Sequence, residues 1–147
     1  MQNPLADIHQ YSNAMTISQA VKFCEKKGLN LTRAMIQNYI RHGLVPPPVS
    51  KRFYTHKHLA ALVLINYMKT VFDMDTIKEN FCPLMDDEGL PLDVYNGIIK
   101  KWAELTAQWK KYVAKRVEDT DVSKLALMVH AAALTSSAAR PRRDGQT

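Results

Sequence analysis

The sequence lacks most features that mark an enzyme, a metal protein or a secreted protein. Its 147 residues include only two cysteines, Cys24 and Cys82, far apart and without a C-x-x-C pattern, which argues against a disulfide framework and a cysteine metal site. We expect both to be buried as small apolar side chains. No apolar run approaches the roughly 18 residues of a membrane-spanning helix, and no charged-then-apolar leader is present. These absences predict a cytoplasmic protein without membrane contact.

Catalytic and cofactor motifs are also missing. The sequence shows no H-E-x-x-H pair, no glycine-rich phosphate loop, no nucleophile elbow and no paired carboxylates. The five histidines are scattered, and His56 and His58, two positions apart, would lie on different faces of a helix. Three consecutive acids, Asp86 to Glu88, are expected to be solvated. We therefore predict no enzymatic activity, no metal site and no cofactor.

Basic charge is present, and its excess is confined to the first half of the chain. Residues 1–60 carry eight Lys or Arg and two acidic residues, whereas residues 61–147 carry twelve of each, so the net charge of +6 belongs to the first half. A basic segment followed by a segment without net charge predicts that an acidic polymer, most simply nucleic acid, binds the N-terminal half of the chain. Ordinary solvated lysines are the alternative.

Apolar spacing and capping residues predict a chain that is mainly α-helical. Thr16 or Ser18 can begin a helix that ends at Gly28, and Thr32 can begin a second helix that ends at Gly43. In each helix the apolar residues recur on one face. Two short helices with a tight connection form a helix-turn-helix, whose second member usually enters the major groove of DNA.

A stiff, basic segment follows the second helix. Residues 46–48 are three prolines, which cannot continue a helix and favour extended backbone. The stretch from Lys51 to Tyr54 then places two cations beside two aromatic residues in a β-favourable sequence. This pattern predicts a small β hairpin, or wing, with Lys51 and Arg52 near its tip.

Residues 56–71 are predicted as a central core helix. A short fourth helix, capped by Asp73 or Asp75, is predicted over residues 73–81. Farther along, large apolar residues recur at alternating spacings of three and four, the pattern of a helix that pairs with a second helix. A last helix over residues 122–133 would complete a C-terminal dimerisation hairpin. The residues predicted to form the dimer seam are Tyr95, Ile98, Trp102, Leu105, Trp109 and Tyr112.

These elements predict five parts. Residues 1–15 would form an N-terminal arm, residues 16–81 a binding domain, and residues 82–91, with two prolines and a glycine, a linker. Residues 92–137 would form the dimerisation region and residues 138–147 a disordered tail. Ser12-Asn13-Ala14 ahead of Met15 resembles the remnant of an expression vector, in which case Met15 would be the natural start.

Three short groups of residues carry a more specific signal. They are Ile36-Gln37-Asn38-Tyr39 in the second helix, Gly43-Leu44 followed by prolines, and Arg52-Phe53-Tyr54. In this order, over residues 16–81, the chain resembles the winged-helix DNA-binding domain of the MerR family of bacterial transcription regulators. It resembles still more closely an uncharacterised bacterial family with a MerR-like head. The MerR family usually carries an arginine at the position of Gln37, and its wing is usually longer.

The resemblance implies a transcription regulator that binds a roughly palindromic duplex site as a dimer. The second helix of each copy would enter a major groove, Arg52 and Tyr54 of the wing would contact phosphates, and the C-terminal helix would pair with its partner. The metal-sensing branch is not implied, because no cysteine follows Cys82. The predicted DNA-binding residues are Thr32, Arg33, Gln37, Arg41, Lys51, Arg52 and Tyr54.

The residues themselves leave alternatives open. Arg33, Gln37 and Arg41 recur every four positions and so share a helix face that can bond to base edges, but an ordinary solvent-exposed face has a similar composition. The Tyr54 hydroxyl can bond to a phosphate, or its ring can pack on the third helix. Thr32 is first a helix cap, and the helix terminus that it defines can also face a phosphate.

The sequence also leaves two alternative functions open. In one, a MerR-like fold that has lost specific DNA recognition serves as a protein-interaction module. In the other, the chain senses an unknown small-molecule effector in a pocket lined by Trp102, Trp109 and Tyr112. The sequence leaves the operator, the regulated genes and the direction of regulation undetermined.

Overall fold

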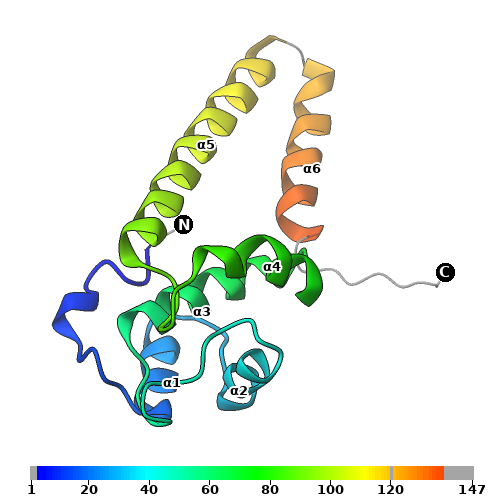
Figure 1. Ribbon diagram of the computed structural model, residues 1–147. Coiled ribbons are helices and arrows are strands. Elements are labelled where there is room, and N and C mark those ends of the chain that lie inside the picture. The colour runs from blue at the N-terminus through cyan, green and yellow to red at the C-terminus, as the bar shows by residue number, and fades with distance from the viewer. Residues whose placement is uncertain (1–2, 120, 138–147) are drawn as a thin grey trace. The chain divides into compact units, whose positions relative to one another are not determined.

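Six α-helices make up most of the chain in the computed structural model, which describes residues 3–119 and 121–137 (Figure 1). The predicted mainly helical class is confirmed. The predicted wing has no regular strand, because the described residues contain only isolated β-bridges, including one between Val49 and Phe53. The chain divides into two units, Met1–Ile98 and Ile99–Thr147.

The first unit contains four complete helices and two single turns. The helices are α1 (Ile17–Lys26), α2 (Arg33–Arg41), α3 (His56–Met68) and α4 (Met74–Phe81), the turns are η1 (Ile8–Gln10) and η2 (Cys82–Leu84), and α5 (Leu92–Asp119) begins here.

Three predicted caps begin three of these helices. The Thr16 hydroxyl accepts a hydrogen bond from the Gln19 amide at 3.3 Å, and the Gln19 side chain accepts one from the Thr16 amide at 2.9 Å, a reciprocal capping box. Thr32 caps α2 at 3.2 Å in the same way, and Asp73 caps α4 at 2.7 Å. These bonds satisfy amides that the first turn of a helix leaves unpaired, and they fix where α1, α2 and α4 start.

Helix α3 is the core of the first unit. Every residue from His58 to Ile65 is buried, which confirms the predicted central helix, although α3 ends at Met68 rather than near residue 71. Helices α1 and α2 lie together on one side of α3 (Figure 1). The α1 and α2 faces turned inward carry buried Phe23, Cys24, Ile36 and Tyr39.

Segments on both sides of the predicted binding domain also pack into this unit. Leu5 and Ile8 of the predicted arm are buried, and Leu90 of the predicted linker is fully buried and donates its amide to the Lys57 carbonyl at 3.0 Å. The Tyr95 hydroxyl donates to the Asn3 side chain. The unit therefore extends to Ile98, past residue 81, where the binding domain was predicted to end, and past the predicted linker. Isolated apolar residues in loops have no periodicity that would have indicated this packing.

The acidic loop is held against the start of α3. Asp86 pairs with the Lys57 ammonium at 2.7 Å, so it is not simply solvated as predicted. Gly89 has φ of 127°, and a Cβ placed there would lie 2.4 Å from the Lys57 carbonyl oxygen. Only glycine permits this close approach of two backbones.

The second unit holds the rest of α5 and helix α6 (Asp121–Ser137). Trp109 stacks on Tyr112 with 5.6 Å between ring centroids and meets His130 of α6 edge to face at 6.1 Å. Within the described ranges, no helix is both long and apolar enough to cross a membrane. The predicted disordered tail, residues 138–147, lies outside the described residues.

Candidate nucleic-acid interface

Helix α2 presents one polar face to solvent. Arg33, Gln37 and Arg41 are all exposed, and their spacing of four residues aligns them along that face. The opposite side carries Ile36 and Tyr39, both buried. Helix packing thus holds the polar face outward in a fixed rotation.

Thr32 caps α2, and the two arginines of this helix remain exposed. The Thr32 side chain is exposed, and its hydroxyl is engaged by the Met35 amide. Arg41, at the other end, donates from its guanidinium to the Asn38 side chain at 2.8 Å, which orients the arginine along the exposed face. Arg33 and Gln37 are the exposed polar residues in between.

A five-residue hairpin follows the prolines. Val49 and Phe53 exchange two backbone hydrogen bonds, at 2.8 and 3.0 Å, and enclose Ser50, Lys51 and Arg52. Ser50 and Lys51 have φ of 52° and 62°, a left-handed conformation that side-chain-bearing residues seldom adopt. Lys51 and Arg52 are exposed at this tip, and the Arg52 guanidinium lies 5.3 Å from the Phe53 ring centroid. The predicted hairpin position of both cations is thus observed, although no regular strand supports them.

The hairpin is anchored through a buried histidine. His58 Nδ1 accepts a hydrogen bond from the Thr55 amide at 3.0 Å, and because an amide can only donate, Nδ1 carries no proton. The other nitrogen, Nε2, therefore carries the proton and donates it to the Pro47 carbonyl at 3.0 Å. Burial lowers the pKa of His58, which favours this neutral form. His58 thus joins the proline segment to the start of α3.

Tyr54 closes the base of the hairpin. Its ring is buried and meets the His58 ring edge to face at 5.4 Å, and its backbone pairs with Met15 through hydrogen bonds of 2.7 and 2.9 Å. Burial raises the pKa of the Tyr54 hydroxyl, while the positive charge of Arg33 acts in the opposite direction. Of the two roles predicted for Tyr54, packing on α3 is therefore observed, and the phosphate contact stays a prediction. The charge effect also indicates that Arg33 of α2 lies near the hairpin base.

The net charge around α2 and the hairpin is positive. Residues 26–72 contain no Asp or Glu, so α2 and the hairpin have no acidic side chain of their own. Two lysines of this segment pair with acids from elsewhere, Lys27 with Asp7 and Lys57 with Asp86. The second contact raises the pKa of Lys57 and lowers that of Asp86.

Lys78 is a further cation that sequence patterns did not single out. A Cβ placed on Gly43, directly after α2, would lie 3.2 Å from the Lys78 Nζ, so this lysine of α4 sits at the α2 C-terminus. A cation is favourable there because the helix dipole is negative at that end. No local signal links the two, since they meet only after folding.

The predicted dimer-seam residues fall in different surroundings. Tyr95 is fully buried in the first unit, and Ile98 lines an apolar groove of that same unit, so the first two seam positions are engaged within their own chain. Leu105 and Tyr112 of the second unit are half exposed. Trp102 is about one-third exposed, and Trp109 is partly covered by Tyr112 and His130. The seam available to a partner therefore begins beyond Ile98.

The remaining reactive residues do not gather. No group of three His, Cys, Asp or Glu side chains in the described ranges could hold a metal ion. Cys24 is buried, and burial raises the pKa of its thiol to about 11. Cys82 was expected to be buried but is only partly covered.

The comparisons with known proteins identify one family. A family model described as "Domain of unknown function (DUF1836)" matches residues 6–97, which is more than half of the chain. The matched range begins ahead of Ser12, so the residues considered as a vector remnant lie inside it. No curated protein and no solved structure matches the chain.

Proposed function

The chain belongs to the DUF1836 family, and we propose that its first unit is a winged helix-turn-helix that binds double-stranded DNA. With its second unit, the chain would act as a dimeric, cytoplasmic regulator of transcription with a MerR-like head and without a catalytic role. The observation that carries this proposal is one exposed polar face on α2 beside a hairpin whose tip holds two cations, in a segment free of acidic residues.

The dimensions of α2 suit the major groove. Arg33 and Arg41 are separated by eight residues, which at 1.5 Å per residue gives a polar face of about 12 Å, similar to the width of the groove. Arginine can donate to guanine or to a phosphate, and Gln37 can bond to an adenine edge. These three residues would discriminate between base sequences.

The hairpin tip would contact the phosphate backbone. A left-handed residue with a side chain costs roughly 1 kcal/mol or more, and Ser50 and Lys51 are two in succession. Such conformations persist at places where the position of a side chain has a use. Here they project Lys51 and Arg52 away from the body, where phosphate charge could be neutralised.

Dimerisation would multiply the few contacts of one small head. The second unit exposes large apolar side chains on both helices: Leu105 is 52% exposed, Leu125 68% and Val129 67%. Several large apolar side chains this exposed on two neighbouring helices suit a contact with another protein. A second copy would cover it and would set the spacing of two half-sites.

Selection from a pool of random duplexes with the full-length protein tests the function directly. We expect enrichment of a sequence with two related half-sites, and we expect Gln37→Ala to relax the preference at one position of each half-site. Lys100→Ala, at an exposed lysine of α5, is the matched control and should leave the preference unchanged. A pool that stays random at moderate salt would contradict the proposal.

One observation favours the protein-interaction alternative. An apolar groove of about 480 Å³ in the first unit is lined by residues that include Met68, Phe72, Phe81 and Leu84, and Phe72 is 51% exposed. An apolar segment of another protein could fill this groove. Failure of the duplex selection would therefore favour this second function.

A further inference from the structure

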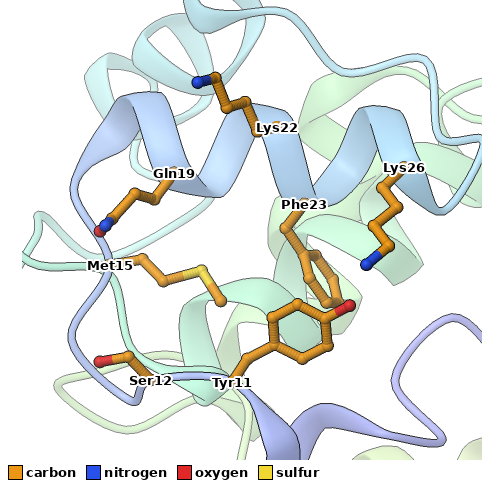
Figure 2. A pocket seen from close by; sticks show the side chains of 7 residues that line it. All are labelled: Tyr11, Ser12, Met15, Gln19, Lys22, Phe23 and Lys26. Carbon is orange, nitrogen blue, oxygen red and sulfur yellow. The ribbon is translucent and has the colours of Figure 1, made fainter.

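A separate cavity of about 270 Å³ lies beside α1, between that helix and the segment that precedes it (Figure 2). Its apolar floor consists of Met15 and Phe23, both buried, and the ring of Tyr11, which meets Phe23 edge to face at 4.8 Å. Figure 2 shows these three side chains gathered below the helix. An apolar floor of this kind favours a flat hydrocarbon group over water.

The rim of the cavity is polar and basic. Lys22, Lys26, Gln19 and Ser12 complete the lining, and no acidic side chain is among the lining residues. The Lys26 ammonium lies 5.5 Å from the Tyr11 ring centroid and points toward that ring in Figure 2. A hydrogen bond to the Tyr11 hydroxyl raises the pKa of Lys26, so this group is fully charged at neutral pH.

An acid close enough to act on the charge of Lys26, Asp7, is already engaged. Asp7 pairs with Lys27 at 2.6 Å, and this hydrogen bond lowers the pKa of the Asp7 carboxyl. In the part of the chain that the structure describes, Lys22 and Lys26 form no ion pair. The rim therefore carries positive charge that an acid from outside the chain could neutralise.

We propose that this cavity binds a small aromatic carboxylic acid, with its ring on Met15 and Phe23 and its carboxylate at Lys26. Gln19 lies seven residues from Lys26, about 10 Å along the helix, so its amide lines the other end of the cavity and does not share the carboxylate. In Figure 2 the stem of Lys22 starts from the same helix but its ammonium points away from Lys26, so Lys22 adds long-range attraction rather than a direct bond. A cavity of this size is at the lower end of ligand sites, which suits a single-ring acid.

The site lies next to the base of the hairpin, because Met15 pairs through its backbone with Tyr54. The binding itself does not depend on the proposed DNA-binding function. It differs from the effector pocket predicted at Trp102, Trp109 and Tyr112 in both place and composition.

Titration of the ¹⁵N-labelled full-length protein, observed by ¹H–¹⁵N correlation NMR, tests the proposal. The probes are phenylacetate and its uncharged analogue phenylacetamide, each added to about 10 mM, since ligands of this size bind in the micromolar to millimolar range. We expect saturable shifts of amides in residues 11–26, with the acid binding at least about threefold more tightly than the amide. Lys26→Gln should remove that preference without changing the thermal midpoint, because Lys26 is exposed.

Two further variants distinguish charge at the cavity from charge elsewhere on the protein. Lys22→Glu reverses the charge at the rim and should weaken the acid but not the amide, whereas Lys100→Gln, on an exposed part of α5, should change neither. Equal binding of acid and amide, shifts outside the cavity, or no saturable shift would each overturn the proposal. Binding of a peptide that ends in an aromatic residue, without binding of the free acid, would overturn it in favour of a protein partner.

Discussion

Replacing His58 by leucine should weaken both the hairpin and the start of α3, because the histidine ring bonds to each of them. Nδ1 accepts the Thr55 amide and Nε2 donates to the Pro47 carbonyl, both at 3.0 Å. Leucine fills a similar volume but can make neither bond. The substitution therefore tests the hydrogen bonds rather than the packing.

The expected loss of stability in His58→Leu follows from the hydrogen-bonding groups that the substitution leaves without a partner. Thr55 is buried, so its amide without a partner costs about 1–3 kcal/mol. Loss of the edge-to-face contact with Tyr54 adds about 1 kcal/mol. Pro47 is exposed, and water can replace the bond at its carbonyl. We expect His58→Leu to reduce the free energy of unfolding by about 2–4 kcal/mol.

His58→Gln provides the matched variant. In α1, Gln19 holds the third helical position and accepts the cap amide of Thr16 at 2.9 Å, the role that His58 fills in α3. A glutamine at residue 58 should restore the bond to the Thr55 amide. We expect His58→Gln to recover at least half of the stability that His58→Leu loses.

The two variants should also differ from the wild type in pH dependence. Burial lowers the pKa of His58 in the folded state below the value of about 6.5 in the unfolded chain. The contribution of the neutral ring is thus complete above that pH and is lost as the pH falls, because the unfolded chain takes up a proton that the folded chain resists. The loss is at most about 1.4 kcal/mol per pH unit. Glutamine does not titrate, so the stability difference between wild type and His58→Gln should shrink toward acid.

Urea unfolding followed by far-ultraviolet circular dichroism, from about pH 7.5 to about pH 5, measures both effects. His42→Gln, at an exposed histidine, controls for a change of residue type and should stay within about 0.5 kcal/mol of the wild type. A His58→Leu variant as stable as this control would refute the anchoring role. A difference between wild type and His58→Gln that stays constant with pH would refute the assigned neutral form.

Three other perturbations test the hairpin, the dimer and the loop that holds α3. Arg52→Ala should weaken binding to all duplexes alike and reduce the logarithmic salt slope by about 0.9 per site, as measured by fluorescence anisotropy, and an unchanged slope would count against the phosphate contact. Leu105→Asp should convert a dimer to a monomer in sedimentation at micromolar concentration, and a monomeric wild type would exclude the proposed seam. Gly89→Ala should lower stability by about 3 kcal/mol or more, because its Cβ would lie 2.4 Å from the Lys57 carbonyl oxygen, and an unchanged thermal midpoint would contradict that clash.

The helices of the head were predictable because their signals are local. Thr16, Thr32 and Asp73 cap the helices that they were expected to cap, and each bond joins residues three positions apart. The apolar run of α3 likewise identified it as the core helix. The polar face of α2 followed from the same period, since burial of Ile36 and Tyr39 leaves Arg33, Gln37 and Arg41 outside.

The hairpin was predictable in position but not in form. Type I′-like turns usually contain Asn-Gly, whereas Ser50-Lys51 carries no such signal for a left-handed pair. The place of Tyr54 depends on Met15 and His58, one of them far along the chain. Sequence alone could therefore not decide between a buried and an exposed tyrosine.

By itself, the sequence determined the helical class, the order of the helices in the head and the concentration of positive charge near α2 and the hairpin. Tertiary structure alone decided that the arm and the predicted linker belong to the head, that Tyr95 is part of its core, and that Lys57 is neutralised by Asp86. The physical reason is the range of the interactions. Caps and apolar periodicity act within one or two helical turns, whereas these contacts join segments that meet only once the chain has folded.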